Sequence, residues 1–354
     1  MRTIVRVILC GFGHVGRAFA RLLEAKHADL ESRYGVDLRI QAVIDIHGAA
    51  VANGIGLSLE ALADLAVAGG QIETLGTYGR PGLGAIETIR EVQAEMLVEA
   101  TPTNLVDGEP GRSHVIAALD RGMDVVTANK GPLVLAPSEL AKQARASGSR
   151  IFVSAAAAAA LPTLDVGRLC TAGARIESIE GILNGTTNYI LGRMDEDGCT
   201  YEEALVAAQR LGIAEADPSL DVEGKDTRSK IVLIANGLFE TILTLDEVET
   251  EGITRITRAD MDRARSRNQV IKLIGSARWR EGVLIARVAP QALDHDHPLA
   301  RVSLAEKGIL LDTDTMGRIT VTGGASSPTG AAAALLKDIL HAHAVRPAGT
   351  MPPA

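Results

Sequence analysis

Aromatic residues and cysteines are both scarce in this chain of 354 residues. Aromatic side chains make up only 3% of the sequence, so alanine and the aliphatic residues must fill most of the core. The three cysteines, Cys10, Cys170 and Cys199, are odd in number and have no CxxC spacing. This pattern argues against a disulfide framework and against a zinc site. We therefore expect a reducing, cytoplasmic location and no bound metal.

Blocks of basic residues and long apolar runs are also missing. The formal net charge is −8, and we expect no nucleic-acid partner because phosphate binding needs clustered positive charge. No stretch of about 18 apolar residues lacks both charge and glycine, so we expect no membrane span. Residues 1–9 are too short and too charged for a signal peptide. Hydrophobic residues at 46% and charged residues at 23% are typical of a soluble globular protein.

Strands and helices alternate through the first part of the chain. Apolar runs predict strands at residues 4–9, 38–45, 96–99, 124–127 and 150–153. Amphipathic helices are predicted between most of them, and the polar, glycine-dotted region 47–84 contains one at about 59–68. This alternation predicts an α/β fold with a Rossmann-like, doubly wound parallel sheet over residues 1–150.

The pattern changes after residue 154, and a second domain of the α+β class is expected at 151–315. Its helices are predicted at about 188–194, 201–211, 224–237 and 258–272, and its strands at about 175–183, 270–279, 283–290, 308–311 and 318–321. A final helix at 327–342 is expected to lie in residues 322–345, which complete the first domain. Residues 346–354 are expected to form a flexible tail.

A glycine-rich loop, GxGxxG at residues 11–16, follows the first strand directly and opens the first helix. In such a loop Gly11 allows the tight turn, Gly13 lets the backbone approach a pyrophosphate, and Gly16 permits close helix–strand packing. Amides at the helix N-terminus then meet the phosphates. The strand–turn–helix setting favours dinucleotide binding over the alternative, a glycine-rich turn without a ligand.

Asp45 ends the second predicted strand, where its carboxylate could accept hydrogen bonds from a ribose diol. The spacing from the glycine loop is longer than usual, and the polar segment 29–37 could account for the extra length. A carboxylate here would repel a 2′-phosphate, so the cofactor is NAD or NADP with a slight lean to NAD. Arg17 and Arg39 keep NADP open, and a solvated carboxylate without a ligand remains the alternative.

Lys130 follows the strand predicted at 124–127 by three residues. The carboxyl edge of a parallel sheet faces the crevice in which ligands bind, so this ammonium group is a candidate for catalysis. A lysine on its own is weak evidence, because most lysines are solvated.

A second constellation of charges lies at residues 211–230. Asp226 and Lys230 are spaced i, i+4 and share one helix face. The residues that follow Lys230 on this helix are apolar. Lys230 is therefore expected to be partly desolvated, with a lowered pKa suited to proton transfer. Glu215 and Asp221 could hold the ammonium group of an amino-acid substrate. The alternative is a solvated helix start with acidic capping.

Taken in order, these motifs resemble the homoserine dehydrogenase family over nearly the whole chain. The glycine loop is unspecific, but it is followed by matching segments at 99–104, 108–110 with His114, 125–132, 181–191, 214–230 and 297–299. The resemblance implies that a nicotinamide cofactor reversibly reduces aspartate β-semialdehyde to homoserine. Hydride addition to an aldehyde carbon beside an ammonium group that protonates the alkoxide is coherent chemistry.

The resemblance also implies roles for individual residues. Lys130 and Lys230 look like the general acid/base lysines, and Asp226 would orient Lys230. The residues implied in substrate binding are Gly185, Thr186, Glu215, Asp221 and Asp226. Those implied in cofactor binding are Gly11, Gly13, His14, Val15, Gly16, Asp45, Ala100, Thr101 and Asn129. The domain at 151–315 would pair two subunits through its sheet and form a homodimer.

The chain departs from the family pattern at residues 154–160. Ser154 stands where the family has a glutamate that helps to hold a sodium ion, and alanines replace the glycines that follow. We expect no strong sodium site, and we expect the alanines to avoid the positive φ angles that glycine allows. Ile213 replaces a common aromatic residue, and residues 323–330 match only loosely. The family's C-terminal regulatory domain is not found, so feedback by threonine through that domain is not expected.

Two other functions remain open at this point. A related dehydrogenase acting on another small amino alcohol or aldehyde would fit the altered segment at 154–160. A catalytically silent paralogue that binds nucleotide is the alternative outside the enzymes, although all the implied acid/base groups are present.

Overall fold

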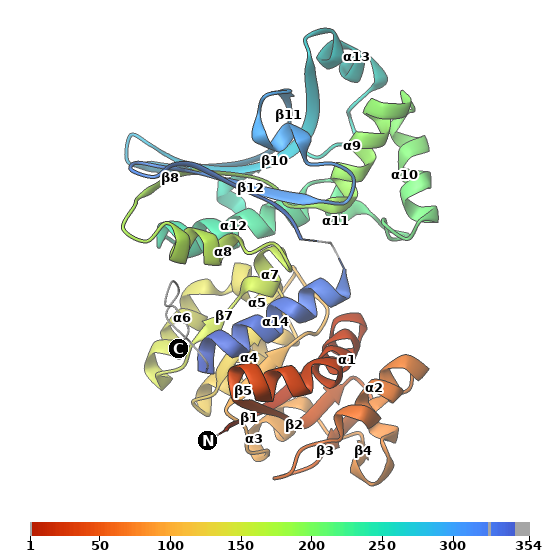
Figure 1. Cartoon of the computed structure of the whole chain (residues 1–354), viewed down its shortest axis with the longest axis vertical. Coiled ribbons are helices and arrows are strands. Elements are labelled where there is room, and N and C mark those ends of the chain that lie inside the picture. Colours follow the sequence, from red (N-terminus) through yellow and green to blue (C-terminus); the bar gives the residue numbers. More distant parts are fainter. Residues whose placement is uncertain (1, 325–326, 344–354) are drawn as a thin grey trace. The chain divides into compact units, whose positions relative to one another are not determined.

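The structure is a computed structural model that describes residues 2–324 and 327–343. It divides into two compact units (Figure 1). Unit 1 contains the described residues up to Ala159 and those from Ser327 onward, and unit 2 contains the described residues between them. The tail expected at residues 346–354 lies outside the described residues. None of the described helices is long and apolar enough to cross a membrane.

Unit 1 is built on a seven-stranded sheet in the order β4-β3-β2-β1-β5-β6-β7. From the first edge to the last, its strands are β4 (Gly79–Pro81), β3 (Gly48–Val51), β2 (Val36–Asp45), β1 (Thr3–Cys10), β5 (Met96–Glu99), β6 (Asp124–Thr127) and β7 (Ile151–Phe152). The five strands from β2 to β7 are parallel, which confirms the predicted α/β class. β3 and β4 are antiparallel and were not predicted, because they are short and rich in glycine.

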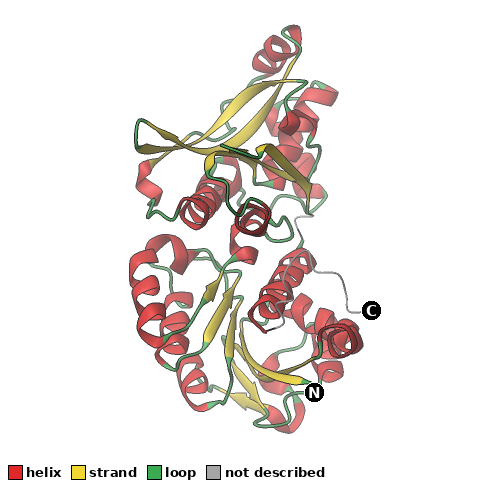
Figure 2. Ribbon diagram, turned by 60° about the vertical axis from the view of Figure 1, so that its left-hand side comes forward, coloured by secondary structure: helices red, strands yellow, loops and turns green. Residues whose placement is uncertain are grey.

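Helices cover both faces of this sheet (Figure 2). In chain order they are α1 (His14–Asp29), the π-helix η1 (Leu30–Tyr34), α2 (Leu59–Ala68), the 3-10 turns η2 (Ile72–Thr74) and η3 (Gly76–Tyr78), α3 (Ala85–Glu91), α4 (Gly111–Asp120), α5 (Gly131–Leu135), α6 (Pro137–Ser147), α7 (Ser154–Ala158) and α14 (Pro328–His343). α1 packs against α2 and α14, and α4 packs against α3 and α6. Buried side chains of β1, α1 and α14 share one core, so the C-terminal helix completes this unit.

Unit 2 contains a six-stranded sheet in the order β13-β12-β8-β10-β11-β9. In that order its strands are β13 (Gly317–Gly323), β12 (Lys307–Thr313), β8 (Ile176–Ile182), β10 (Gln269–Arg280), β11 (Val283–Asp294) and β9 (Val248–Thr250). Only the β9–β11 pair is parallel. The predicted α+β class of this part is therefore confirmed, and β8 and β10 are the two central strands of its sheet.

The helical segments of unit 2 precede these strands or lie between them in the chain. They are α8 (Thr163–Asp165), η4 (Val166–Cys170), α9 (Gly185–Asp197), α10 (Tyr201–Arg210), α11 (Ser219–Val222), α12 (Lys225–Phe239), η5 (Leu245–Glu247), α13 (Arg258–Ser266) and η6 (Pro298–Arg301). α9, α12 and α13 all pack against β10. The helix predicted at 258–272 was too long, because Asn268 adopts a φ of 58° and β10 begins directly after it.

Candidate active site

The glycine turn of unit 1 is shaped by close backbone contacts. Gly11 has a φ of +94°, and a Cβ atom placed on it would lie 2.7 Å from the carbonyl carbon of Ala100. A Cβ on Gly16 would lie 2.0 Å from the carbonyl oxygen of Gly11. A Cβ on Gly13 would meet nothing within 4 Å, so the space beside this residue is open. Gly11 and Gly16 therefore serve the packing of the turn, whereas Gly13 leaves room for a ligand.

The N-terminus of α1 faces this open space. The helix begins at His14, its N-cap is Gly13, and no side chain caps its first amides. His14 and Gly13 are exposed, whereas Val15 is half-buried. A long helix that presents uncapped amides beside an open glycine is suited to bind the phosphates of a dinucleotide.

Asp45 ends β2, and its Oδ1 accepts a 3.0 Å hydrogen bond from the amide of Ile46. The two arginines that could have favoured a 2′-phosphate are engaged elsewhere. Arg17 donates to the carbonyl oxygen of Gly70 at 2.6 Å, and Arg39 pairs with Asp37 at 2.6 Å. The half-buried Asp45 carboxylate is thus the charged side chain that β2 presents at its carboxyl end.

The loops after β5 and β6 meet at the carboxyl edge of the sheet. Nδ2 of Asn129 donates to Oγ1 of Thr101 at 3.1 Å and to the carbonyl oxygen of Pro102 at 3.3 Å. The amide of Lys130 donates to Oγ1 of Thr103 at 3.4 Å. The structure thereby brings together Thr101, Asn129 and Lys130, with Ala100 against the glycine turn. Asn129 is buried and Lys130 is half-buried.

In unit 2, Asn184 organises the charged residues. It is the N-cap of α9, where its Oδ1 accepts from the amide of Thr187 at 2.9 Å. Its Nδ2 donates to Oδ1 of Asp221 at 2.6 Å and to Oδ2 of Asp226 at 2.9 Å. One amide group therefore joins the start of α9 to two carboxylates that lie 37 and 42 residues away in the chain. Asn184 lies in the segment 181–191 that resembles the family, but this role was not predicted from the sequence.

Lys230 completes the cluster. Its Nζ donates to Oδ2 of Asp226 at 2.5 Å and to the carbonyl oxygen of Leu183 at 2.8 Å, so the expected i, i+4 contact is present. The two side chains are only 15% and 13% exposed, which makes this pair far less screened than a surface salt bridge. An ammonium ion oriented by a carboxylate and a carbonyl can deliver a proton in a fixed direction.

Asp221 lies in an environment that disfavours its ionised form. Burial raises its pKa, and the nearby charge of Asp226 raises it further. The hydrogen bond from Asn184 and the charge of Lys230 act in the opposite direction. Two carboxylates thus share one lysine, and this excess of negative charge is suited to bind a further cation.

The other residues implied in substrate binding differ in their burial. Gly185 and Thr186 are buried in the first turn of α9, and Oγ1 of Thr186 donates to the carbonyl oxygen of Ile213 at 3.1 Å. Glu215 is exposed, and its backbone carbonyl oxygen accepts a 3.2 Å hydrogen bond from Nε2 of Gln209. The described contacts therefore do not join the Glu215 carboxylate to the cluster.

The alanine segment forms the short helix α7, and Ser154 anchors its start. Oγ of Ser154 donates to Oδ1 of Asp338 at 2.8 Å, its amide donates to Oδ2 at 3.0 Å, and Nζ of Lys337 donates to its Oγ at 2.8 Å. The expectation that every alanine here avoids positive φ was wrong. Ala159 adopts a φ of 53°, because the chain turns sharply at the end of α7.

Comparisons with known proteins cover both units. The homoserine dehydrogenase family model matches residues 162–340, and the model of the homoserine dehydrogenase NAD-binding domain matches residues 11–154. An NAD(+)-dependent homoserine dehydrogenase of Pseudomonas canavaninivorans is 39% identical over 96% of this chain and 97% of that protein. A homoserine dehydrogenase of Methanocaldococcus jannaschii is 37% identical over 95% of this chain and 97% of that protein.

Solved structures agree with these matches. The crystal structure of a homoserine dehydrogenase from Thiobacillus denitrificans superposes with a TM-score of 0.82 at 29% identity, covering 96% of this chain and 73% of that chain. The homoserine dehydrogenase of Thermoplasma acidophilum superposes with a TM-score of 0.81 at 25% identity, covering 97% of this chain and 100% of that chain.

Proposed function

The chain belongs to the homoserine dehydrogenase family, and from this premise we infer the reaction and the roles of its residues. The enzyme interconverts L-homoserine and L-aspartate 4-semialdehyde with a nicotinamide cofactor, a step in the biosynthesis of threonine and methionine. Unit 1 binds the cofactor and unit 2 binds the substrate. The single observation that carries the substrate assignment is the cluster of Asp221, Asp226 and Lys230 around Asn184.

Lys230 is the proposed proton donor in the direction of reduction. A bound reduced nicotinamide would supply the hydride for the aldehyde carbon. In the proposed proton transfer an N–H bond of Lys230 breaks as its proton passes to the carbonyl oxygen, which becomes the hydroxyl group of homoserine. An ammonium group has three donors. Asp226 and Leu183 accept from Lys230, which leaves one N–H to donate to the substrate.

Lys130 is the second proposed catalytic lysine. It follows β6 and its backbone is held by Thr103 next to Asn129, at the edge of the sheet where ligands of this fold class bind. Its ammonium charge would stabilise the negative charge that develops on the reacting oxygen.

The substrate ammonium group is proposed to bind the acidic side of the cluster. Asp221 supplies the carboxylate, Glu215 supplies a second one from the exposed loop after α10, and Asp226 orients Lys230. Gly185 and Thr186 present the first turn of α9 to the substrate. The excess of carboxylates over lysines supports this assignment, because a bound ammonium ion would balance it.

NAD rather than NADP is the proposed cofactor. The glycine turn with His14 and Val15 would hold the pyrophosphate, Asp45 the ribose, and Ala100, Thr101 and Asn129 the nicotinamide side. Arg17 and Arg39 already have partners, which supports the choice of NAD. The three free cysteines fit a cytoplasmic enzyme.

A homodimer formed through unit 2 is proposed as the assembly. The β10–β11 hairpin leaves apolar side chains exposed, with Trp279 at 43%, Val283 at 63% and Ile285 at 43%. Sedimentation equilibrium tests this proposal. A mass of twice the chain supports it, and a monomer at every concentration contradicts it.

The function is tested by following reduced nicotinamide while the purified protein oxidises L-homoserine, with NAD and NADP in parallel and a panel of other small amino alcohols. We expect L-homoserine to have the highest kcat/KM and NAD to be preferred. Faster turnover of another alcohol would replace the substrate assignment, and binding of NAD without turnover of any panel member would contradict the enzymatic one.

A further inference from the structure

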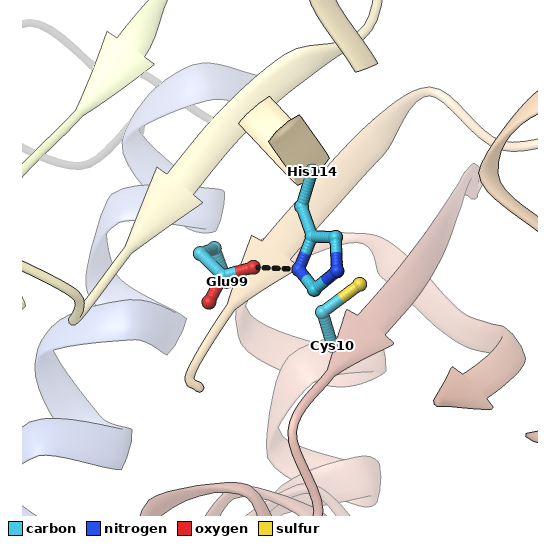
Figure 3. A group of neighbouring side chains, drawn as sticks. All are labelled: Cys10, Glu99 and His114. Carbon is cyan, nitrogen blue, oxygen red and sulfur yellow. Dashed lines mark hydrogen bonds and ion pairs between the residues drawn. The ribbon is translucent and has the colours of Figure 1, made fainter. Parts of the chain in front are cut away.

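A buried carboxylate, that of Glu99, lies next to the loops that carry the proposed nicotinamide-side residues. Glu99 ends β5, Cys10 ends β1 and His114 lies on α4, and the three side chains form one group (Figure 3). Glu99 is fully buried, and His114 is only 6% exposed. Burying a carboxylate without hydrogen-bond partners would be strongly unfavourable. The donors that surround Glu99 therefore indicate which segments of the chain it holds in place.

Four donors surround the Glu99 carboxylate. Oε2 accepts a 2.9 Å hydrogen bond from Nδ1 of His114. Oε1 accepts from the amide of Thr101 at 2.9 Å, from Oγ1 of Thr101, and from Nδ2 of Asn129 at 3.4 Å. A single side chain therefore ties the loop after β5 to the loop after β6. Lys130 is the residue next to Asn129.

Cys10 closes the group from β1. Burial raises the pKa of its thiol well above the usual range, and the charge of Glu99 raises it further, so the thiol keeps its proton. Cys10, Glu99 and His114 place their ligand atoms within 4.8 Å of one another, a spacing that could suit a metal ion. Because both Glu99 oxygens already accept from protein donors and the thiol is neutral, the group is better described as a hydrogen-bonded support.

We propose that Glu99 and His114 are positioning residues for hydride transfer, which hold Thr101, Asn129 and Lys130 in the geometry that the reaction needs. This proposal rests on the proposed function. No role for either residue could be predicted from the sequence, because their bond joins residues 15 positions apart and the bond from Asn129 to Glu99 spans 30 positions. Errors of about 1 Å in the placement of reacting groups can cost on the order of 100-fold in rate.

The substitution Glu99→Gln tests the proposal, since it keeps the shape of the side chain but offers one acceptor oxygen where the carboxylate offers two. The NH2 group of the new side chain would replace one acceptor oxygen and would face another donor, which is His114 on one side or Thr101 and Asn129 on the other. We expect kcat for homoserine oxidation to fall roughly 10- to 100-fold. We expect the Kd of ADP-ribose, which lacks the nicotinamide, to stay within about twofold, because its site is the glycine turn.

Glu95→Gln is the matched control. Glu95 precedes β5, and its carboxylate pairs with Arg6 at 2.6 Å on the protein surface, so its substitution should leave kcat unchanged. If Glu99→Gln does not fold, His114→Leu, which removes the donor to Oε2 of Glu99, is measured in its place. A folded variant with the kcat of the native chain would overturn the proposal, as would a loss of ADP-ribose affinity equal to the loss of kcat. Inactivity of the native chain on homoserine would instead reject the proposed function itself.

Discussion

The two units offer their proposed ligands different chemistry. In unit 1 the glycine turn offers backbone groups to its ligand. Its shape depends on close backbone contacts that a methyl group on Gly11 or Gly16 would disrupt. In unit 2 the cluster is made of charged side chains that share one asparagine amide. Substitutions in the glycine turn of unit 1 should therefore act through steric clashes. Substitutions in the cluster of unit 2 should act through changes of charge.

The largest effect is expected at Lys230. Lys230→Met keeps the length and the apolar stem of the side chain but removes the proton donor, so kcat should fall roughly 10²- to 10⁴-fold. The Kd of NAD should not change. Lys225→Met is the matched control on the same helix, because Lys225 is 44% exposed and pairs with Glu223. Equal rates for the two variants would remove Lys230 from the mechanism.

The next largest effects are expected at two glycines of one turn, where one substitution should change stability and the other NAD binding. Gly16→Ala places a Cβ 2.0 Å from a carbonyl oxygen and should lower the free energy of unfolding by about 1–3 kcal/mol. Gly13→Ala meets nothing within 4 Å, so stability should hold while the new methyl group enters the space of the pyrophosphate and weakens NAD binding about tenfold or more. Urea denaturation and NAD titration measure the two effects. Unchanged NAD affinity in Gly13→Ala would contradict the assignment of the turn.

At Asp221, function and stability should move in opposite directions. Because burial and Asp226 raise its pKa above the unfolded value, the folded state holds this proton more tightly. Ionisation of Asp221 therefore lowers stability as pH rises through its two pKa values, and at neutral pH Asp221→Asn should raise the Tm. The same variant should raise KM for homoserine several-fold, since one carboxylate is lost.

The pH dependence of the native chain follows from the same shift. KM for homoserine should rise as pH falls through the raised pKa of Asp221, at a higher pH than an ordinary aspartate would produce. In Asp221→Asn this rise should disappear. Parallel KM profiles for the two proteins would show that Asp221 does not bind the substrate.

The smallest effect is expected at the end of α7. Ala159→Gly should raise the free energy of unfolding by about 1 kcal/mol, because glycine adopts a φ of 53° without strain. Ala157→Gly, inside the same helix, should lower it by about 1 kcal/mol. Thermal denaturation of the pair measures both. A loss of stability in each would show that the turn at Ala159 is not strained.

Sequence reasoning predicted the features that depend on local pattern. Parallel strands buried on both faces are continuous apolar runs, so β1, β2, β5 and β6 could be predicted close to their bounds. β3 and β4 have four and three residues and no alternation, and only the pairing of β3 with β2 and of β4 with β3 makes them strands.

In the site, too, local contacts could be predicted from the sequence and long-range contacts could not. The Asp226–Lys230 pair follows from i, i+4 spacing on one helix and is present at 2.5 Å. The role of Asn184, the burial of Glu99 against His114 and the exposure of Glu215 depend on contacts between segments far apart in the chain. A polar residue directly before a helix is a signal for a cap, but nothing local to Asn184 tells which carboxylates its amide will reach.

The central claim is that this chain transfers hydride from L-homoserine to NAD. We would oxidise L-homoserine in which both hydrogens of the hydroxyl-bearing carbon are replaced by deuterium, and analyse the nicotinamide product by NMR. We expect one deuterium in each reduced nicotinamide, and a slower rate than with unlabelled substrate if hydride transfer limits turnover. Reduced nicotinamide without deuterium, or no reduction of NAD by homoserine at all, would contradict it.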